Sequence, residues 1–479
     1  MPAHLSAVIR LPDFDPFFAG VIWITFNYYS PIQMNCLNGG MTKIVANNYL
    51  VELLTDTHAR TLELLQGLDS EQIMGPRFPV VNPLLWEIGH VAWFYEQFIL
   101  RMLYGYKPVL ENGDSIYDSI AIEHSVRWDL PLLRLEDCLK FIDTVRHRLI
   151  DRLEGEYASE QDSFIYQFAA FHQDMHNEAY SYTRQTLAYP TPDFSSAKHL
   201  PQDKKNNGPL PGDAEIPGGR FTLGSGQDAA FLFDNEKWSH EVTVCPFRIA
   251  RATVTNQEYA AFVEDDGYRR RDLWHDVGWT WRSRTKSERP VYWIEDGPGK
   301  WLMQRFDQYI ELPAYEPVIH VNWYEASAYC NWAKRRLPTE IEWEVAAAGE
   351  PDGAGALCRD RKRLYPWGNS IADETQANLD GRVNGCIDVA AWPAGDSAFG
   401  CRQMLGNVWE WTYSTFDPYP GFKPDAYREY SEPVFGTRKV LRGGAWATRS
   451  RMVNNMYRNF FTPERRDILA GFRTCALFD

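Results

Sequence analysis

The chain has 479 residues, 44% of them apolar and 14% aromatic, so it is long enough for two or more domains with sizeable cores. Its formal net charge of −15 argues against nucleic acid or an anionic membrane as a partner, because both would repel it. The eight cysteines are scattered without a CxxC pair, and no apolar run approaches the roughly 18 residues that span a bilayer, a pattern typical of a cytoplasmic protein.

The first 40 residues differ in residue pattern from the rest of the chain. Their apolar stretch, residues 17–26, lacks the basic residues that precede the core of a signal peptide. Met41 directly precedes a regular helical pattern. We therefore expect residues 1–40 to be a disordered extension, or the result of a start assigned too far upstream, with no function of their own.

Residues 43–187 have the pattern of a helical domain. Four long segments show apolar residues at helical spacing with no interior proline, at 47–66, 83–105, 134–154 and 159–187. Four such helices predict a bundle, whose core is a natural place for a metal site.

Residues 172–178, in the last of these segments, read HQDMHNE. His172 and His176 are one helical turn apart, so both leave the same, otherwise apolar face of the helix. Two imidazoles arranged in this way can bind a transition metal, although a hydrogen-bonded pair of core histidines fits the same spacing. Glu178 lies about 200° around the helix from His176, so we expect it to point away and to have a structural or supporting role.

His90 is a third candidate ligand. It lies within the apolar segment 83–105, between Trp86 and Trp93, where a lone histidine is more often a satisfied core residue. Beside the pair on another helix, however, three neutral nitrogens would cover one face of an ion. They would leave positions open for substrate and dioxygen, as nonheme iron chemistry requires. The sequence therefore indicates three histidines as the ligand set.

Residues 188–215 are rich in Pro, Asn, Asp and Gly and predict a linker. Residues 216–479 then change to short strands, many turns and many tryptophans. This half resembles the formylglycine-generating-enzyme domain, an α+β fold related to C-type lectins. The resemblance rests on motifs that run in order: IPGGRFTLGS (216–225), RATVTNQEYAAFV (251–263), the stretch 317–349, YPWGN (365–369), MLGNVWEWT (404–412), VLRGGAW (440–446) and GFR (471–473).

The chemistry of formylglycine-generating enzymes is not expected here. The cysteine pair that those enzymes use aligns with Thr448 and Val453 in this chain. A helical domain with an HxxxHxE motif joined to such a domain resembles instead the nonheme iron sulfoxide synthases of ergothioneine and ovothiol biosynthesis, and the related selenoneine synthases. This resemblance covers roughly residues 43–479.

The resemblance implies a DinB-like four-helix bundle followed by the α+β domain, with Fe(II) held by His90, His172 and His176. It implies an O2-dependent reaction that joins the chalcogen of a donor to the imidazole of hercynine, the trimethylated betaine of histidine. It also implies an active-site tyrosine. Tyr427 is the better candidate and Tyr430 is its neighbour, although two packed surface tyrosines fit the same spacing.

The tail of the chain bears on the donor. Family members that use γ-glutamylcysteine carry Asn-Trp-Asp where this chain has Asn459, Phe460 and Phe461, and the aspartate binds the donor's amine. Two carboxylate-binding arginines of the family fall at His124 and Arg127, so only one is retained. We expect Tyr430 and Phe460 to hold the trimethylammonium group of hercynine, with Asn459 on a polar group of the same substrate.

On this view Phe461 and His124 line the side of the site where the donor enters. The departures favour an uncharged donor such as a selenosugar, and therefore a selenoneine synthase. The main alternative is an ergothioneine sulfoxide synthase that uses cysteine, with Arg127 on its carboxylate, or γ-glutamylcysteine. A metal-dependent thiol transferase and a non-catalytic binding module are further alternatives. The fused second domain argues against the transferase, and three buried imidazoles argue against the binding module.

Overall fold

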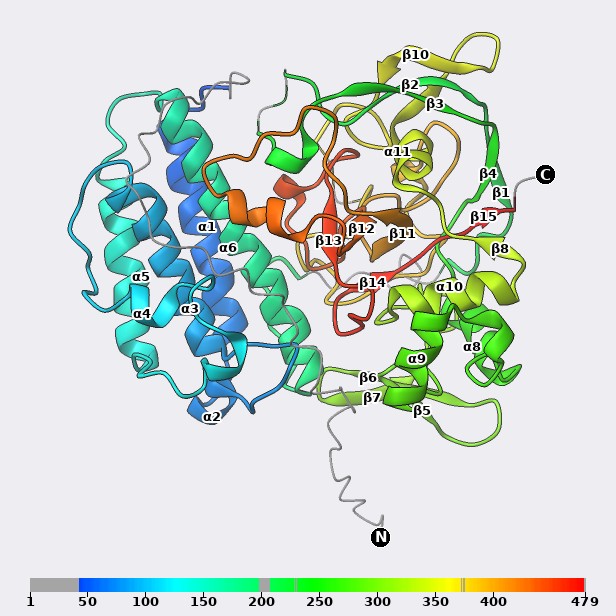
Figure 1. Ribbon diagram of the computed structural model, residues 1–479, viewed down its shortest axis with the longest axis horizontal. Helices are drawn as coiled ribbons and strands as arrows, with labels where there is room; N and C mark the ends of the chain where they lie inside the picture. The colour runs from blue at the N-terminus through cyan, green and yellow to red at the C-terminus, as the bar shows by residue number, and fades with distance from the viewer. Residues whose placement is uncertain are drawn as a thin grey trace.

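The computed structural model describes residues 43–197, 207–227, 229, 231–371, 373 and 375–477. The expected extension 1–40 and part of the expected linker lie outside these residues. Figure 1 shows the two halves of the chain side by side, with helix α6 running between the helical half and the mixed half.

The helical half contains the four predicted helices, α1 (Asn47–Leu65), α3 (Leu84–Tyr95), α5 (Leu135–Ile150) and α6 (Glu160–Thr186). Helix α6 packs against α1 and α3, and α3 also packs against α5. The connections hold α2 (Ser70–Met74), α4 (Asp114–Tyr117) and the 3₁₀ turn η2 (His124–Val126). Regular α-helix in the segment 83–105 ends at Tyr95, because the chain continues as the π-helical turn η1 (Glu96–Arg101). No helix in the described residues combines the length and the apolarity needed to cross a bilayer.

The second half is built on two four-stranded sheets. One has the order β1-β4-β15-β8, with strands Asp213–Ile216, Phe247–Ala250, Cys475–Ala476 and Arg335–Arg336. The other has the order β13-β12-β11-β14, with strands Asn459–Phe461, Lys439–Arg442, Trp409–Thr415 and Ala470–Gly471. Strands β11, β12 and β13 are antiparallel, and β14 is parallel to β11.

Smaller ribbons complete the sheet structure: β2 (Gly219–Leu223) with β3 (His240–Val244), β5 (Trp293–Glu295) with β6 (Trp301–Arg305) and β7 (Gln308–Glu311), and β9 (Gly349–Pro351) with β10 (Leu357–Lys362). The helices are α8 (Asn256–Glu264), α9 (Asp276–Thr285), α10 (Trp323–Trp332) and α11 (Glu340–Ala348). Reciprocal capping boxes start α8, α10 and α11 at Thr255, Asn322 and Thr339, which explains why each helix begins where it does.

One hydrophobic core runs through both halves. Phe168 and Phe171 of α6 contact Phe233 of the second half, with ring centroids 5.7 and 6.4 Å apart. Phe194, in the expected linker, is 2% exposed and lies under the guanidinium of Arg60 at 4.0 Å. Strand β1 also begins inside the expected linker. The connection is therefore anchored to the folded body at the residues that flank its undescribed part, and the two halves share one interior.

The 3₁₀ turn η3 (Asp234–Glu236) buries two carboxyl groups in the second half. Burial raises the pKa of Glu236 to about 8, although the nearby Arg442 and Lys237 partly oppose the shift. Burial also raises the pKa of Asp234 to about 6, while a 2.5 Å hydrogen bond from Ser431 Oγ acts in the opposite direction. At neutral pH Glu236 therefore carries a proton and Asp234 is mostly ionised.

Replacement of Glu236 by glutamine should stabilise the protein at pH 8 and have little effect at pH 4.5. Below about pH 4.5 the carboxyl is protonated in both the folded and the unfolded chain, and above it the unfolded chain loses this proton first. The wild type therefore loses stability as the pH rises towards 8, by up to a few kcal/mol, and the glutamine variant does not. Thermal unfolding at the two pH values tests this, with the exposed Glu111→Gln as the control. An equal gain at both pH values would contradict the assignment.

Candidate metal centre

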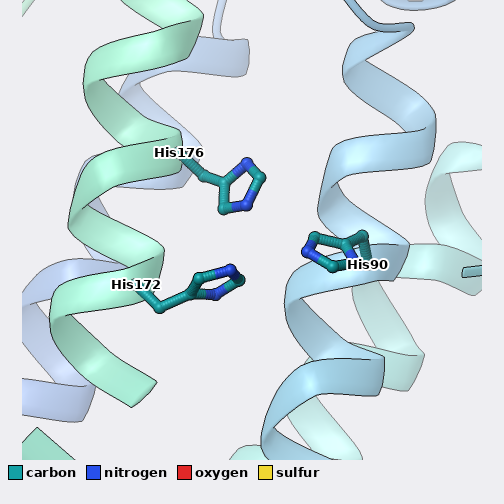
Figure 2. A group of neighbouring side chains, drawn as sticks. All are labelled: His90, His172 and His176. Atoms are coloured by element: carbon teal, nitrogen blue, oxygen red, sulfur yellow. The ribbon is translucent and has the colours of Figure 1, made fainter. Parts of the chain in front are cut away.

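Three histidines converge at the contact between α3 and α6. His90 projects from α3, and His172 and His176 project from successive turns of α6 (Figure 2). Each histidine has one ring nitrogen that lies within 4.8 Å of a ring nitrogen of each of the other two. The ring centroids are 4.6 to 5.2 Å apart. The structure thus brings together the three ligands predicted from the sequence.

Aromatic side chains hold the imidazoles in place. His90 stacks on Trp86, with centroids 5.0 Å apart, and also contacts Trp93 at 5.9 Å. His172 stacks on Phe94 at 3.8 Å. Burial holds the pKa of both His90 and His172 well below its usual range, and the neighbouring histidines add to the effect. Both rings are therefore neutral at physiological pH, which is the form that binds a metal ion.

Hydrogen bonds fix the orientation of two of the rings. His90 Nδ1 lies 2.8 Å from the carbonyl oxygen of Tyr117, and His176 Nδ1 lies 3.3 Å from Glu87 Oε2. These oxygens accept, so each Nδ1 carries the hydrogen and each Nε2 keeps its lone pair. The buried Nδ1 of His172 has no hydrogen-bond partner in the described part of the chain, and coordination satisfies such an atom. The donor set fits a first-row divalent ion such as Fe(II).

The sequence analysis did not identify Glu87, although it supports His176 directly. Glu87 is 3% exposed and also accepts a 2.7 Å hydrogen bond from Asn82 Nδ2. Asn82 in turn accepts from Arg127 Nη1 at 2.7 Å. The sequence held one signal for this role: an acid three residues before His90, in a segment with few other polar residues.

Glu178 points away from the triad, as its position around the helix predicts. Its carboxylate accepts hydrogen bonds from Trp409 Nε1, at 2.7 Å, and from Thr448 Oγ1. Both partners belong to the second half of the chain, so Glu178 takes part in the contact between the halves.

The two predicted tyrosines lie on the 3₁₀ turn η6 (Arg428–Tyr430) and the residue before it. The Tyr427 ring lies 6.5 Å from that of His172, and 5.2 and 5.0 Å from those of Phe94 and Phe98. Tyr430 lies further along the same aromatic cluster, 5.0 Å from Phe233. Tyr427 is therefore the tyrosine beside the triad.

The tail residues lie on strand β13, next to Tyr430. Phe460 contacts Tyr430 with centroids 5.6 Å apart, and one of its faces stacks on Phe416 at 4.1 Å. Asn459 Oδ1 accepts from the backbone N–H of Phe460 at 2.8 Å. Phe461 lies under the guanidinium of Arg465 at 5.3 Å.

His124 and Arg127 lie on the bundle side, near residues 80–82. His124 Nε2 is 2.7 Å from the Val81 carbonyl oxygen, and Arg465 Nη2 donates to the Val80 carbonyl at 3.4 Å. The guanidinium of Arg127 lies over Trp86 at 3.8 Å. Burial lowers the pKa of Arg127 to about 10, so it remains a cation at neutral pH. Arg127 is engaged with Asn82 and Trp86 and acts on His176 through Asn82 and Glu87.

Replacement of Glu87 by alanine should weaken divalent-metal binding about 10- to 100-fold, because the His176 ring loses the acceptor that orients it. Titration with Co(II) or Fe(II) without oxygen measures the affinity. Glu71→Ala, at an exposed position on α2, is the matched control and should bind as the wild type does. An affinity that is unchanged in Glu87→Ala would show that the carboxylate does not support the ligand. His172→Ala should abolish binding.

Comparison with known proteins agrees with this architecture. Residues 53–179 match the DinB superfamily, and residues 197–476 match the sulfatase-modifying factor enzyme 1-like domain. The fold class expected from the sequence is thus confirmed. A formylglycine-generating enzyme of Thermomonospora curvata is 29% identical over 321 residues, 60% of this chain and 99% of that protein.

Two relatives extend over both domains. The hercynine oxygenase of Mycolicibacterium thermoresistibile is 37% identical over 433 residues, 88% of this chain and 94% of that protein. The hercynine oxygenase of Mycolicibacterium smegmatis is 35% identical over 438 residues, 90% of this chain and 99% of that protein. The chain is therefore an enzyme that belongs to the hercynine oxygenase family of sulfoxide synthases.

Proposed function

We propose that this protein is an oxygen-dependent nonheme iron(II) enzyme that forms a carbon–chalcogen bond at the imidazole of hercynine. The observation that carries the proposal is the buried histidine triad beside Tyr427, in a chain whose relatives of matching length are hercynine oxygenases. Three imidazole ligands suit Fe(II) and leave coordination positions for substrates.

Iron(II) held by His90, His172 and His176 would supply the redox chemistry that uses dioxygen. The chain's own residues orient the substrates, exclude water and hold a proton at the Tyr427 hydroxyl. Phe94, Phe98 and Phe168 surround the Tyr427 ring at 5.2, 5.0 and 6.1 Å. In such an apolar setting a phenol can deliver its proton to an oxygen atom that develops negative charge.

The Tyr430 side of the site suits the trimethylammonium group of hercynine. A quaternary cation has no N–H to donate, so aromatic faces and nearby negative charge must hold it. Tyr430 and Phe460 supply the rings, and the buried carboxylate of Asp234 lies nearby. Burial raises the pKa of Tyr430 well above its usual range, and Tyr457, Glu236 and Asp234 add to the shift. Asn459 lies on the same strand and offers an amide to a polar group of the substrate.

The donor side carries an aromatic wall and basic side chains that already have partners. Arg465 lies over Phe461, and His124 and Arg127 lie on the opposite, bundle side near residues 80–82. The guanidinium of Arg465 is paired with the buried carboxylate of Asp467 through two 2.6 Å hydrogen bonds, so a donor amine placed against Phe461 would find no free carboxylate. This arrangement favours a donor without a free ammonium at that position.

The chalcogen itself is a separate question. Membership of the hercynine oxygenase family of sulfoxide synthases favours the ergothioneine-type reaction with a sulfur donor, and cysteine is the first candidate. Arg127 already donates to Asn82 and to the backbone carbonyls of Ser119 and Ile122, so a cysteine carboxylate would have to replace one of these contacts to reach it. A selenosugar is the second candidate, because Phe461 and Arg465 can accept an uncharged, hydroxylated donor. In both cases γ-glutamylcysteine is disfavoured.

An assay with alternative donors tests the proposal. The protein is loaded with iron and hercynine without oxygen, given cysteine, γ-glutamylcysteine or a selenosugar, and then exposed to air before mass spectrometry. We expect a hercynine adduct from cysteine or the selenosugar, and turnover of γ-glutamylcysteine at least about 100-fold slower, because its ammonium is unpaired. Phe461→Asp should raise the γ-glutamylcysteine rate. Efficient use of γ-glutamylcysteine by the wild type would contradict the donor assignment and would identify the protein as an ergothioneine sulfoxide synthase that uses γ-glutamylcysteine.

Tyr427→Phe tests the proton-holding role. Loss of the hydroxyl should lower kcat for the hercynine adduct about 100-fold while metal affinity and the KM for hercynine stay within a factor of about three. Tyr413→Phe, an exposed tyrosine on β11, is the matched control. Wild-type kcat in the Tyr427 variant would remove this residue from the reaction.

A further inference from the structure

The metal-binding helix carries a second functional stripe. Residues 172–178 repeat the pattern histidine, any residue, acid: His172 with Asp174, and His176 with Glu178. The histidines are one turn apart, and so are the acids, which lie about 200° around the helix from them. Helix α6 thus presents two imidazoles to the bundle and two carboxylates to the second domain, beside which it runs in Figure 1.

Asp174 makes a bidentate ion pair with the second domain. It receives hydrogen bonds from Arg451 Nε at 2.7 Å and Arg451 Nη2 at 2.9 Å, and from Thr57 Oγ1 of α1 at 2.8 Å. Asp174 is 1% exposed. Arg451 also pairs with Asp56 of α1. The ion pair therefore joins α6, α1 and the 3₁₀ turn η8 (Ser450–Met452).

Glu178 makes the second contact, one turn further along. Its two oxygens accept from Trp409 at the start of β11 and from Thr448 in the segment after β12. Both of these partners are 2% exposed. The Thr448 hydroxyl also accepts from the backbone N–H of Ala445 at 2.8 Å, which holds it in place.

These contacts bear on the site because of the chain connections. The loop between β11 and β12 carries Tyr427 and Tyr430, Trp409 lies at the beginning of β11, and Thr448 and Arg451 follow β12. The carboxylates therefore bind α6 to the first residue of β11 and to the segment that follows β12, at the ends of these strands opposite the tyrosine loop. The distance from the histidine pair to Tyr427 depends on how α6 is seated against those strands.

We infer that Asp174 and Glu178 are positioning residues that set the distance between the metal ligands of α6 and the Tyr427 loop. The inference rests on the proposed function for its catalytic consequence, but the docking contact itself can be measured without turnover. A merely structural role would affect stability and leave the relation between the helix and the loop unchanged.

Two substitutions of Glu178 separate these possibilities. Glutamine keeps both contacts, because its oxygen can accept from Trp409 and its amide can donate to the Thr448 hydroxyl. Methionine has a similar length and keeps neither, so the Trp409 N–H is left buried without an acceptor. Glu52→Met, at an exposed position on α1, is the matched control.

Hydrogen exchange of the folded protein is the first measurement. In Glu178→Met we expect the backbone amides of residues 172–178 and of residues 427–434 to exchange about ten-fold faster or more. In Glu178→Gln the same amides should exchange at the wild-type rate. Thr448→Val, which removes the contact from the other side, should have the same effect if Glu178→Met folds poorly. The inference would be overturned if residues 427–434 exchanged at the wild-type rate in both Glu178→Met and Thr448→Val.

Metal affinity and turnover give the second measurement. Glu178→Met should bind Co(II) within about three-fold of the wild type, because the triad is intact, while kcat falls about ten-fold or more and Glu178→Gln restores it. Equal kcat in the methionine and glutamine variants would also refute the positioning role. If the wild type turns over no hercynine, the proposed function fails, and the exchange data still decide the docking contact.

Discussion

Helix α6 packs against the other bundle helices on one face and against the second domain on another. The geometry of the site depends on the register of α6 against each of them. A helix with apolar surfaces alone could slide or rotate with little change in buried area. Here the polar residues that directly follow each histidine, Gln173 and Asn177, remove that freedom. Gln173 accepts from the Tyr95 hydroxyl at 2.9 Å, and Asn177 accepts from Thr61 Oγ1 at 2.7 Å. Each pair forms in one register only, and a shift would leave buried polar groups unpaired, at about 1–3 kcal/mol each.

The same burial sets the chemistry of the triad. Burial holds His90 and His172 in their neutral form, and a neutral imidazole has one lone pair for a metal and one N–H for a supporting acceptor. Glu87 and the Tyr117 carbonyl supply two such acceptors. Arg127 extends the support by one further step through Asn82. Arg127, which resembles a substrate-binding arginine, thus also belongs to the hydrogen-bond network that supports the histidine ligands. Its loss would disturb metal binding as well as donor binding.

The sequence was sufficient for those parts of the site that depend on local periodicity. The one-turn spacing predicted the shared face of His172 and His176, and the same geometry predicted that Glu178 points away. The four long helices also followed from apolar spacing. Glu87, the partners of Arg127 and the anchored linker could not be predicted in this way, because each depends on which elements meet in three dimensions. The strand order of the second domain has the same origin: β14 and β15 pair with strands far away in the sequence.

The donor side of the site can distinguish charge more readily than it can distinguish sulfur from selenium. An aromatic wall responds to size and polarity, and one methylene in an apolar pocket changes binding by only about 1–3 kcal/mol. Exchange of one chalcogen for the other alters the donor less than that. A buried ammonium without a partner costs more, because no counter-charge offsets its loss of hydration. In the donor arrangement proposed above, a preference for selenium comes from the group that delivers it: Phe461 suits an uncharged sugar and offers the ammonium of a γ-glutamyl donor no counter-charge.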